Sequence, residues 1–154
     1  MIKLPILKNA WIKVPHCYLP ESKDIAFAII VFESEWTKTF GKSDAFIVAL
    51  NNLFIEMDEE EKYVTGYTKD GTKFSDSKIV GLARTPTWIW VHITPSQRLC
   101  ESSLTHELVH IALWSVSAKG HGDPDHEGDK YEGWYLEHSA FIDRVNKTLC
   151  AMDL

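Results

Sequence analysis

The sequence predicts an α+β fold in which a small, mainly antiparallel sheet is combined with an N-terminal helix and two later helices. Apolar residues recur at helical spacing near the N-terminus, short β-branched and aromatic runs separated by turn formers follow, and helical spacing returns after Thr94. The chain has 154 residues, the length of one ordinary domain, and no repeat or linker divides it. We therefore expect one domain spanning residues 1–154.

The first predicted helix begins at Ser22, a residue type favoured at helix N-caps, and ends before Gly41. The region after it changes to short runs whose residues favour strands. Asn51-Asn52 and Asp70-Gly71 are typical turn formers between such runs. The predicted strands are Ala45–Leu50, Leu53–Met57, Lys62–Thr68, Lys78–Ala83 and Thr87–Thr94.

Two further helices complete the predicted fold. The tetrapeptide Thr94–Gln97 has the form of a helix start, with Thr at the N-cap, Pro at the first helical position and Gln able to bond back to the cap. That helix is expected to run to Lys119, with Gly120 beyond its end. Apolar residues at helical spacing predict a final helix over Trp134–Leu149.

Charge and hydropathy narrow the classes of function. The formal net charge of −6 repels a phosphate backbone and so disfavours a nucleic-acid partner. The longest apolar run, Ile25–Phe32, is far shorter than the ~20 residues of a membrane-spanning helix, so we expect no membrane partner. Pro5 and Lys8 interrupt the apolar stretch at the N-terminus, which lacks the form of a signal peptide. We therefore expect a cytoplasmic protein.

Three cysteines, Cys17, Cys100 and Cys150, are present without C-x-x-C spacing. An odd number without that spacing argues against both a disulfide framework and a cysteine zinc site. We expect reduced, buried thiols.

The second helix carries the motif H-E-x-x-H at His106, Glu107 and His110. Histidines four residues apart lie on the same face of a helix, close enough for both to bind one metal ion. Apolar residues occupy the rest of the helix circumference, so these polar side chains need strong partners to offset their desolvation. The motif predicts a metal site in which Glu107 stands beside the metal as general base.

A third ligand is required, because catalytic zinc usually has three protein ligands and keeps its fourth position for water. We choose His126, which lies in the turn-rich segment after the helix. It is five residues further along the chain than His121 and so has more length in which to return to the metal. The alternatives are His121, Glu132 and Glu137.

Other polar residues receive weaker assignments. Asp123 or Asp125 could accept the second ring N–H of a ligating histidine. His138 lies between aromatic residues on the apolar face of the last helix and is expected in the core. Tyr131 and Tyr135 could each donate to an oxyanion, and the sequence does not select one.

This order of a strand, a helix with H-E-x-x-H, a short His-Gly loop and a helix with a large aromatic residue resembles the zincin metallopeptidases. Among them it looks most like the small SprT-like group, in which a histidine after the active-site helix is the third zinc ligand. The metzincin pattern is absent, because Leu113 and Val116 stand where it requires Gly and His. In zincins a strand before the active-site helix often pairs with an extended substrate, and Trp88–Ile93 is our candidate for it.

The resemblance implies one Zn²⁺ bound by His106, His110 and His126, and hydrolysis of a peptide or protein substrate with Glu107 as general base. Two alternatives stay open. The same groups could hydrolyse another amide or an ester, or a fourth protein ligand could make a zinc-stabilised binding module without activity. The sequence does not indicate the oligomeric state.

Overall fold

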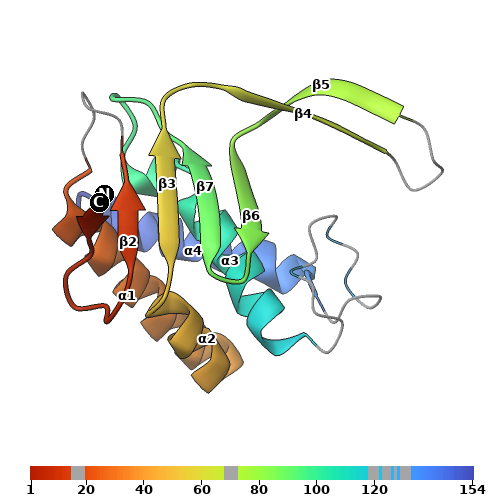
Figure 1. Cartoon of the computed structure of the whole chain (residues 1–154). Helices are drawn as coiled ribbons and strands as arrows, with labels where there is room; N and C mark the ends of the chain where they lie inside the picture. Colours follow the sequence, from red (N-terminus) through yellow and green to blue (C-terminus); the bar gives the residue numbers. More distant parts are fainter. Residues whose placement is uncertain (15–19, 68–72, 118–121, 123–125, 127, 129–132) are drawn as a thin grey trace.

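One face of a five-stranded sheet is covered by helices in the computed structural model of the chain (Figure 1). The structure describes residues 1–14, 20–67, 73–117, 122, 126, 128 and 133–154. Helices α1, α3 and α4 lie behind the sheet in Figure 1, and α2 lies at its lower end. The helices are α1 (Ser22–Phe40), α2 (Asp44–Leu50), α3 (Leu104–Val116) and α4 (Leu136–Ala151), with a short 3₁₀ helix η1 (Leu99–Glu101) before α3.

The strands of the main sheet lie in the order β1-β2-β3-β7-β6, and β4 pairs with β5 in a separate ribbon. Three of the five strand pairs are antiparallel: β1 with β2, β6 with β7, and β4 with β5. The two central pairs, β2 with β3 and β3 with β7, are parallel. The strands are β1 (Ile2–Lys3), β2 (Trp11–Lys13), β3 (Phe54–Asp58), β4 (Lys62–Tyr67), β5 (Lys73–Ile79), β6 (Gly81–Thr85) and β7 (Trp88–His92).

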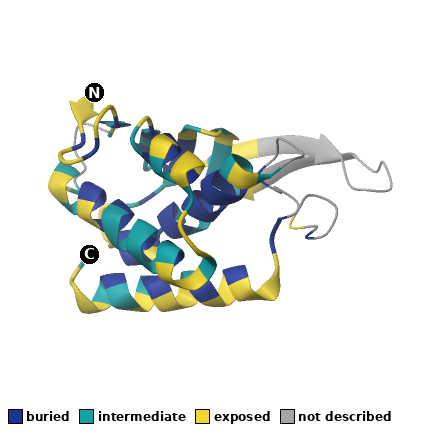
Figure 2. Cartoon of the chain, turned by 90° about the horizontal axis from the view of Figure 1, so that it is seen from below, coloured by how far each residue is buried: buried dark blue, intermediate teal, exposed yellow. Residues whose placement is uncertain are grey.

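The predicted α+β class and the first and last helices are confirmed. Helix α1 has the predicted bounds, and its apolar stripe is buried through Ile25, Ile29, Phe32 and Trp36. Helix α4 begins two residues after the predicted start and buries one face against α1 and α3. Figure 2 shows buried residues where the helices face inward and exposed residues along the outer side of α4.

One predicted element and one predicted helix start are wrong. The run Ala45–Leu50, expected as a strand, belongs to α2, because the Ser43 hydroxyl caps the helix by accepting the Phe46 N–H at 3.2 Å. The Gln97 side chain does bond back to the Thr94 N–H, at 2.9 Å. The chain nevertheless forms a turn and η1 there, and the long helix begins only at Leu104.

Three predicted strands, Leu53–Met57, Lys62–Thr68 and Thr87–Thr94, differ from β3, β4 and β7 only at their ends, with Thr68 outside the described residues. Strands β1, β2 and most of β5 have no predicted counterpart. The run Lys78–Ala83, predicted as one strand, contains the end of β5 and the start of β6, and Val80 between them belongs to neither strand. Strand β7 alternates as expected, with Ile89, Val91 and the following Ile93 buried beneath the helices. Trp88 lies on the opposite face and is 37% exposed.

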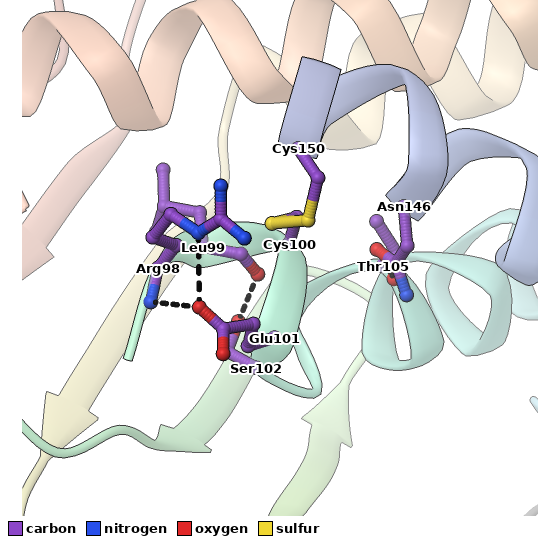
Figure 3. The surroundings of a disulfide bond; sticks show 8 residues. All are labelled: Arg98, Leu99, Cys100, Glu101, Ser102, Thr105, Asn146 and Cys150. Carbon is purple, nitrogen blue, oxygen red and sulfur yellow. Dashed lines mark hydrogen bonds and ion pairs between the residues drawn. A yellow bond between two sulfur atoms is a disulfide. The ribbon is translucent and has the colours of Figure 1, made fainter. Parts of the chain in front are cut away.

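A disulfide bond joins Cys100 in η1 to Cys150 near the end of α4 (Figure 3). The expectation of reduced thiols is therefore wrong for these two cysteines, whereas Cys17 lies outside the described residues. Their Cα atoms are 5.4 Å apart although 50 residues separate them in sequence, so only the packing of η1 on α4 brings them together. Nearby, the Thr105 hydroxyl donates to the Asn146 side-chain oxygen at 2.8 Å.

No helix in the described part of the chain is both long and apolar enough to cross a membrane.

Candidate metal centre

Helix α3 is buried on most of its circumference, and this burial determines the environment of the H-E-x-x-H motif. It packs against β6, α2 and α4. Glu107 and His110 are buried with the apolar residues, whereas His106 is half-buried. The motif thus lies between packed elements and not on a solvated helix face.

Three histidines converge beside α3. The Nε2 atom of His110 lies 3.3 Å from Nε2 of His106 and 3.3 Å from Nε2 of His126. One ligand atom from each residue lies within 4.8 Å of the others. Two nitrogens bound at about 2.05 Å to a tetrahedral zinc ion would lie about 3.3 Å apart. The arrangement therefore fits a metal ion held by the three ring nitrogens.

Trp134, which lies just before α4, forms one wall of this cluster. Its indole ring stacks on His126 with ring centroids 4.2 Å apart, and its centroid is 4.7 Å from that of His106 and 4.8 Å from that of His110. The indole N–H donates to the Ser139 hydroxyl at 2.9 Å, which fixes the orientation of the ring. Trp134 thus holds the three imidazoles from one side.

The main chain of Gly122 orients His110. Its carbonyl oxygen lies 2.6 Å from Nδ1 of His110, and because a carbonyl only accepts, Nδ1 must carry the hydrogen. The neutral ring then has its lone pair on Nε2, which faces the other two histidines. A Cβ at Gly122 would lie 2.8 Å from the carbonyl oxygen of His110, so only glycine fits this position.

Burial shifts the pKa values of His106 and Glu107, the two adjacent titratable groups at the start of the motif. Burial raises the pKa of Glu107 to about 8, against the opposing effect of a hydrogen bond from the main chain of Ala83. Burial also lowers the pKa of His106 to about 4, and positive charge on His110 or His126 lowers it further. Near neutral pH the His106 ring is therefore uncharged, as a metal ligand must be.

A cavity of about 500 Å³ opens beside His106 and Glu107. It lies between the β5–β6 connection and the start of α3. A small molecule can therefore reach His106 next to a buried carboxyl group. The cavity is lined by Lys78, Ile79, Val80, Gly81, Glu101, Ser102, Ser103, His106 and Glu107.

The structure brings together the predicted set of His106, His110 and His126, and it places Glu107 on the same helix beside them. Of the alternative third ligands, Glu137 is exposed on α4 and does not belong to the cluster. The residues that lie outside the described part of the chain are His121, Asp123, Asp125, Tyr131 and Glu132.

Two assignments outside the cluster can also be compared with the structure. His138 lies in the core as expected, where its ring stacks on Phe40 and its Nδ1 accepts the Tyr135 N–H at 2.9 Å. The segment Trp88–Ile93 cannot pair with a substrate strand, because β7 is bonded to β3 on one side and to β6 on the other. Strand β6 is the edge strand beside the cluster.

Sequence reasoning missed the orienting roles of Gly122 and Trp134. A main-chain carbonyl has no signature in a sequence. The sequence indicated Trp134 only as the large aromatic residue at the start of a helix. Its stacking on His126 depends on how the chain returns to α3.

Comparisons of the chain with protein-family models, with characterised proteins and with solved structures find no match.

Proposed function

We propose that this protein is a zinc-dependent peptidase with a zincin-like domain, in which His106, His110 and His126 hold the metal. The observation that carries the proposal is the convergence of the three imidazoles: Nε2 of His110 lies 3.3 Å from Nε2 of both His106 and His126, the separation of two nitrogens on a tetrahedral zinc ion, and one ligand atom of each residue lies within 4.8 Å of the others. Zinc bound by three histidines lowers the pKa of a bound water to about 7 and polarises a carbonyl group.

Glu107 has the properties of a general base at such a site. It is 4% exposed, lies one residue after a ligand, and lines the cavity next to the cluster. Burial makes the ionised form of this carboxyl group costly, and a divalent cation beside it would favour that ionised form. The ionised carboxylate then accepts a proton from the attacking water and can return it to the leaving amine.

The arrangement around the cluster favours a catalytic over a purely structural metal site. Trp134 covers one side of the three imidazoles, while the cavity reaches His106 from the side of Glu107. Structural zinc sites usually have four protein ligands, and three histidines form the group within the described residues. This supports an enzyme rather than the zinc-stabilised binding module.

Peptide is the substrate class that the neighbouring strand supports. Strand β6 lies at the edge of the main sheet and its main chain bonds to Glu107 through Ala83. An extended peptide can add to such an edge by main-chain hydrogen bonds, here to the outward-facing carbonyl groups, because the Ala83 N–H is bonded to Glu107. Another amide or an ester remains the alternative substrate to test.

The disulfide changes our expectation for the compartment. Disulfide bonds persist in oxidising environments and are rare in the cytosol. Because Cys100 and Cys150 are joined, we infer an oxidising compartment in place of the cytoplasm.

The proposal is tested by metal analysis and by cleavage of an unbiased peptide library with the wild type and the Glu107→Gln variant. We expect about one zinc per chain in both proteins, and hydrolysis reduced by several orders of magnitude in the variant. Glu137→Gln, which changes an exposed glutamate on α4, is the matched control and should cleave like the wild type. A zinc-loaded wild type that cleaves no peptide would overturn the proposed peptidase activity.

A further inference from the structure

The edge strand β6 presents part of its main chain to α3. The His92 N–H bonds to the Val80 carbonyl at 2.9 Å, so in the antiparallel ladder the main-chain groups of Gly81 and Ala83 point away from β7. The carboxyl group of Glu107 lies on that outer side and accepts a hydrogen bond from Ala83. The general base is therefore fastened to the strand that borders the cavity.

Gly81 lies against the same carboxyl group. A Cβ at this position would be 2.5 Å from Oε1 of Glu107, 2.9 Å from its Cγ and 2.6 Å from Oγ of Ser103. Real side chains do not approach this closely, so a larger residue at position 81 would force a neighbour to move. The space that a side chain would occupy is taken by Glu107 and Ser103.

The backbone torsion angles do not explain why residue 81 is a glycine. The glycines with left-handed φ values in the described residues are Gly41 and Gly128, and Gly81 is not among them. Any residue can adopt its backbone conformation, so the need for glycine at position 81 comes from space alone.

The neighbour that would move is Glu107. The Ser103 hydroxyl donates to the Val80 carbonyl at 2.6 Å and is held by that bond. The carboxyl group is the end of a longer, more flexible side chain, so it yields at the smallest cost. The three histidines are not among the atoms nearest to the added Cβ.

We propose that Gly81 is a positioning residue for catalysis: the absence of a side chain leaves the place beside β6 in which the Glu107 carboxylate is held next to the metal site. This inference rests on the proposed function, because it assigns Glu107 the role of base. It predicts that a substitution at position 81 changes the position of the Glu107 carboxylate and leaves the affinity for zinc unchanged.

The test compares Gly81→Ala and Glu107→Gln with the wild type. The control is Leu82→Ala, which alters the same strand at a residue whose main chain pairs with Trp90 of β7. Zinc affinity is measured by competition with a chelator, and acetohydroxamate binding to the zinc-loaded protein by calorimetry. Acetohydroxamate chelates zinc through two oxygens and can bond to a neighbouring carboxylate, so it reports on Glu107 without hydrolysis. The kcat and KM values are measured on a peptide selected from the library.

We expect Gly81→Ala to keep zinc affinity within about threefold and to bind acetohydroxamate at least about tenfold more weakly, as Glu107→Gln does. Its kcat should fall about a hundredfold with little change in KM, because the lost interaction acts in the transition state. Leu82→Ala should match the wild type in all these measurements. A double variant, Gly81→Ala with Ser103→Ala, removes one of the close contacts and should recover part of the hydroxamate affinity.

The results distinguish this inference from the proposed function. If the wild type binds zinc but cleaves no peptide, and Gly81→Ala still weakens acetohydroxamate binding, the peptidase proposal fails and the placement of Glu107 by Gly81 stands. Unchanged hydroxamate binding in a folded Gly81→Ala protein would overturn the inference. So would a tenfold loss of zinc affinity in that variant, or a wild type that binds no zinc.

Discussion

The indole ring of Trp134 and the imidazole of His126 are stacked with their planes 9° from parallel and their centroids 4.2 Å apart. His126 has a φ of 55°, a left-handed conformation that is uncommon for residues other than glycine. Its side chain is exposed, so the stack with Trp134 is a principal contact that orients the ring. One aromatic residue thus links the proposed third ligand to the start of α4.

Removing this stack should weaken the metal site. We expect Trp134→Ala to lower zinc affinity about 10- to 100-fold, the range typical for residues that orient metal ligands. Chelator competition measures the effect. Trp88→Ala, which removes an indole from the opposite face of the sheet, is the control and should leave the affinity unchanged. Equal affinities for all three proteins would show that Trp134 does not orient the ligands.

The third ligand can be tested without disturbing the backbone. Asn tolerates the left-handed region better than Ala does, so His126→Asn removes the imidazole while keeping the local conformation. We expect zinc affinity to fall at least as far as in His110→Ala. Wild-type affinity in His126→Asn would assign the third position to another residue.

The raised pKa of Glu107 makes the stability of the metal-free protein depend on pH. The folded-state pKa is about 8 and the ordinary value is 4.5, so between these values the native state binds more protons than the unfolded state. The free energy of unfolding should therefore fall as the pH rises through this range, by at most about 1.4 kcal/mol per pH unit. Glu107→Gln removes this dependence.

Urea unfolding of both metal-free proteins at several pH values from 5 to 8 measures the difference. The His106 ring, whose pKa is lowered to about 4, destabilises the native state as the pH falls below 6.5. It is present in both proteins, so subtracting one curve from the other isolates Glu107. Parallel curves would mean that the carboxyl group is ionised in the metal-free fold.

The disulfide between Cys100 and Cys150 should contribute substantially to stability. Closing a loop between residues 50 apart lowers the entropy of the unfolded chain by an amount worth about 4 kcal/mol at 25 °C. We expect Cys100→Ser with Cys150→Ser to lose a large part of this value, measured by chemical unfolding under oxidising conditions. Added reductant should destabilise the wild type and leave the double variant unaffected.

The histidine cluster could be predicted because its signal is local. His106 and His110 share a helix face at a spacing that any helix imposes, and His126 follows from the length of chain needed to return to it. Gly81 carried no such signal, because its closeness to Glu107 depends on where β6 lies against α3. Contacts between distant segments are set by packing.

The dependence on packing between distant segments also explains the errors in the predicted fold. Helix α2 has seven residues, too few for helical and strand periodicity to be distinguished. The parallel pairing of β2 with β3 joins segments about forty residues apart and involves no turn from which it could be predicted. The Cys100–Cys150 bond likewise depends on η1 meeting the end of α4.

All the residues assigned to the metal site lie between Cys100 and Cys150 in the sequence. A single cut in the chain between those cysteines would leave two fragments that remain covalently joined. Self-cleavage in this region would therefore escape notice on a gel run without reductant and would appear only after the sulfur bridge is broken. Intact mass on such a gel is consequently no guarantee that a preparation of this protein has an unbroken backbone.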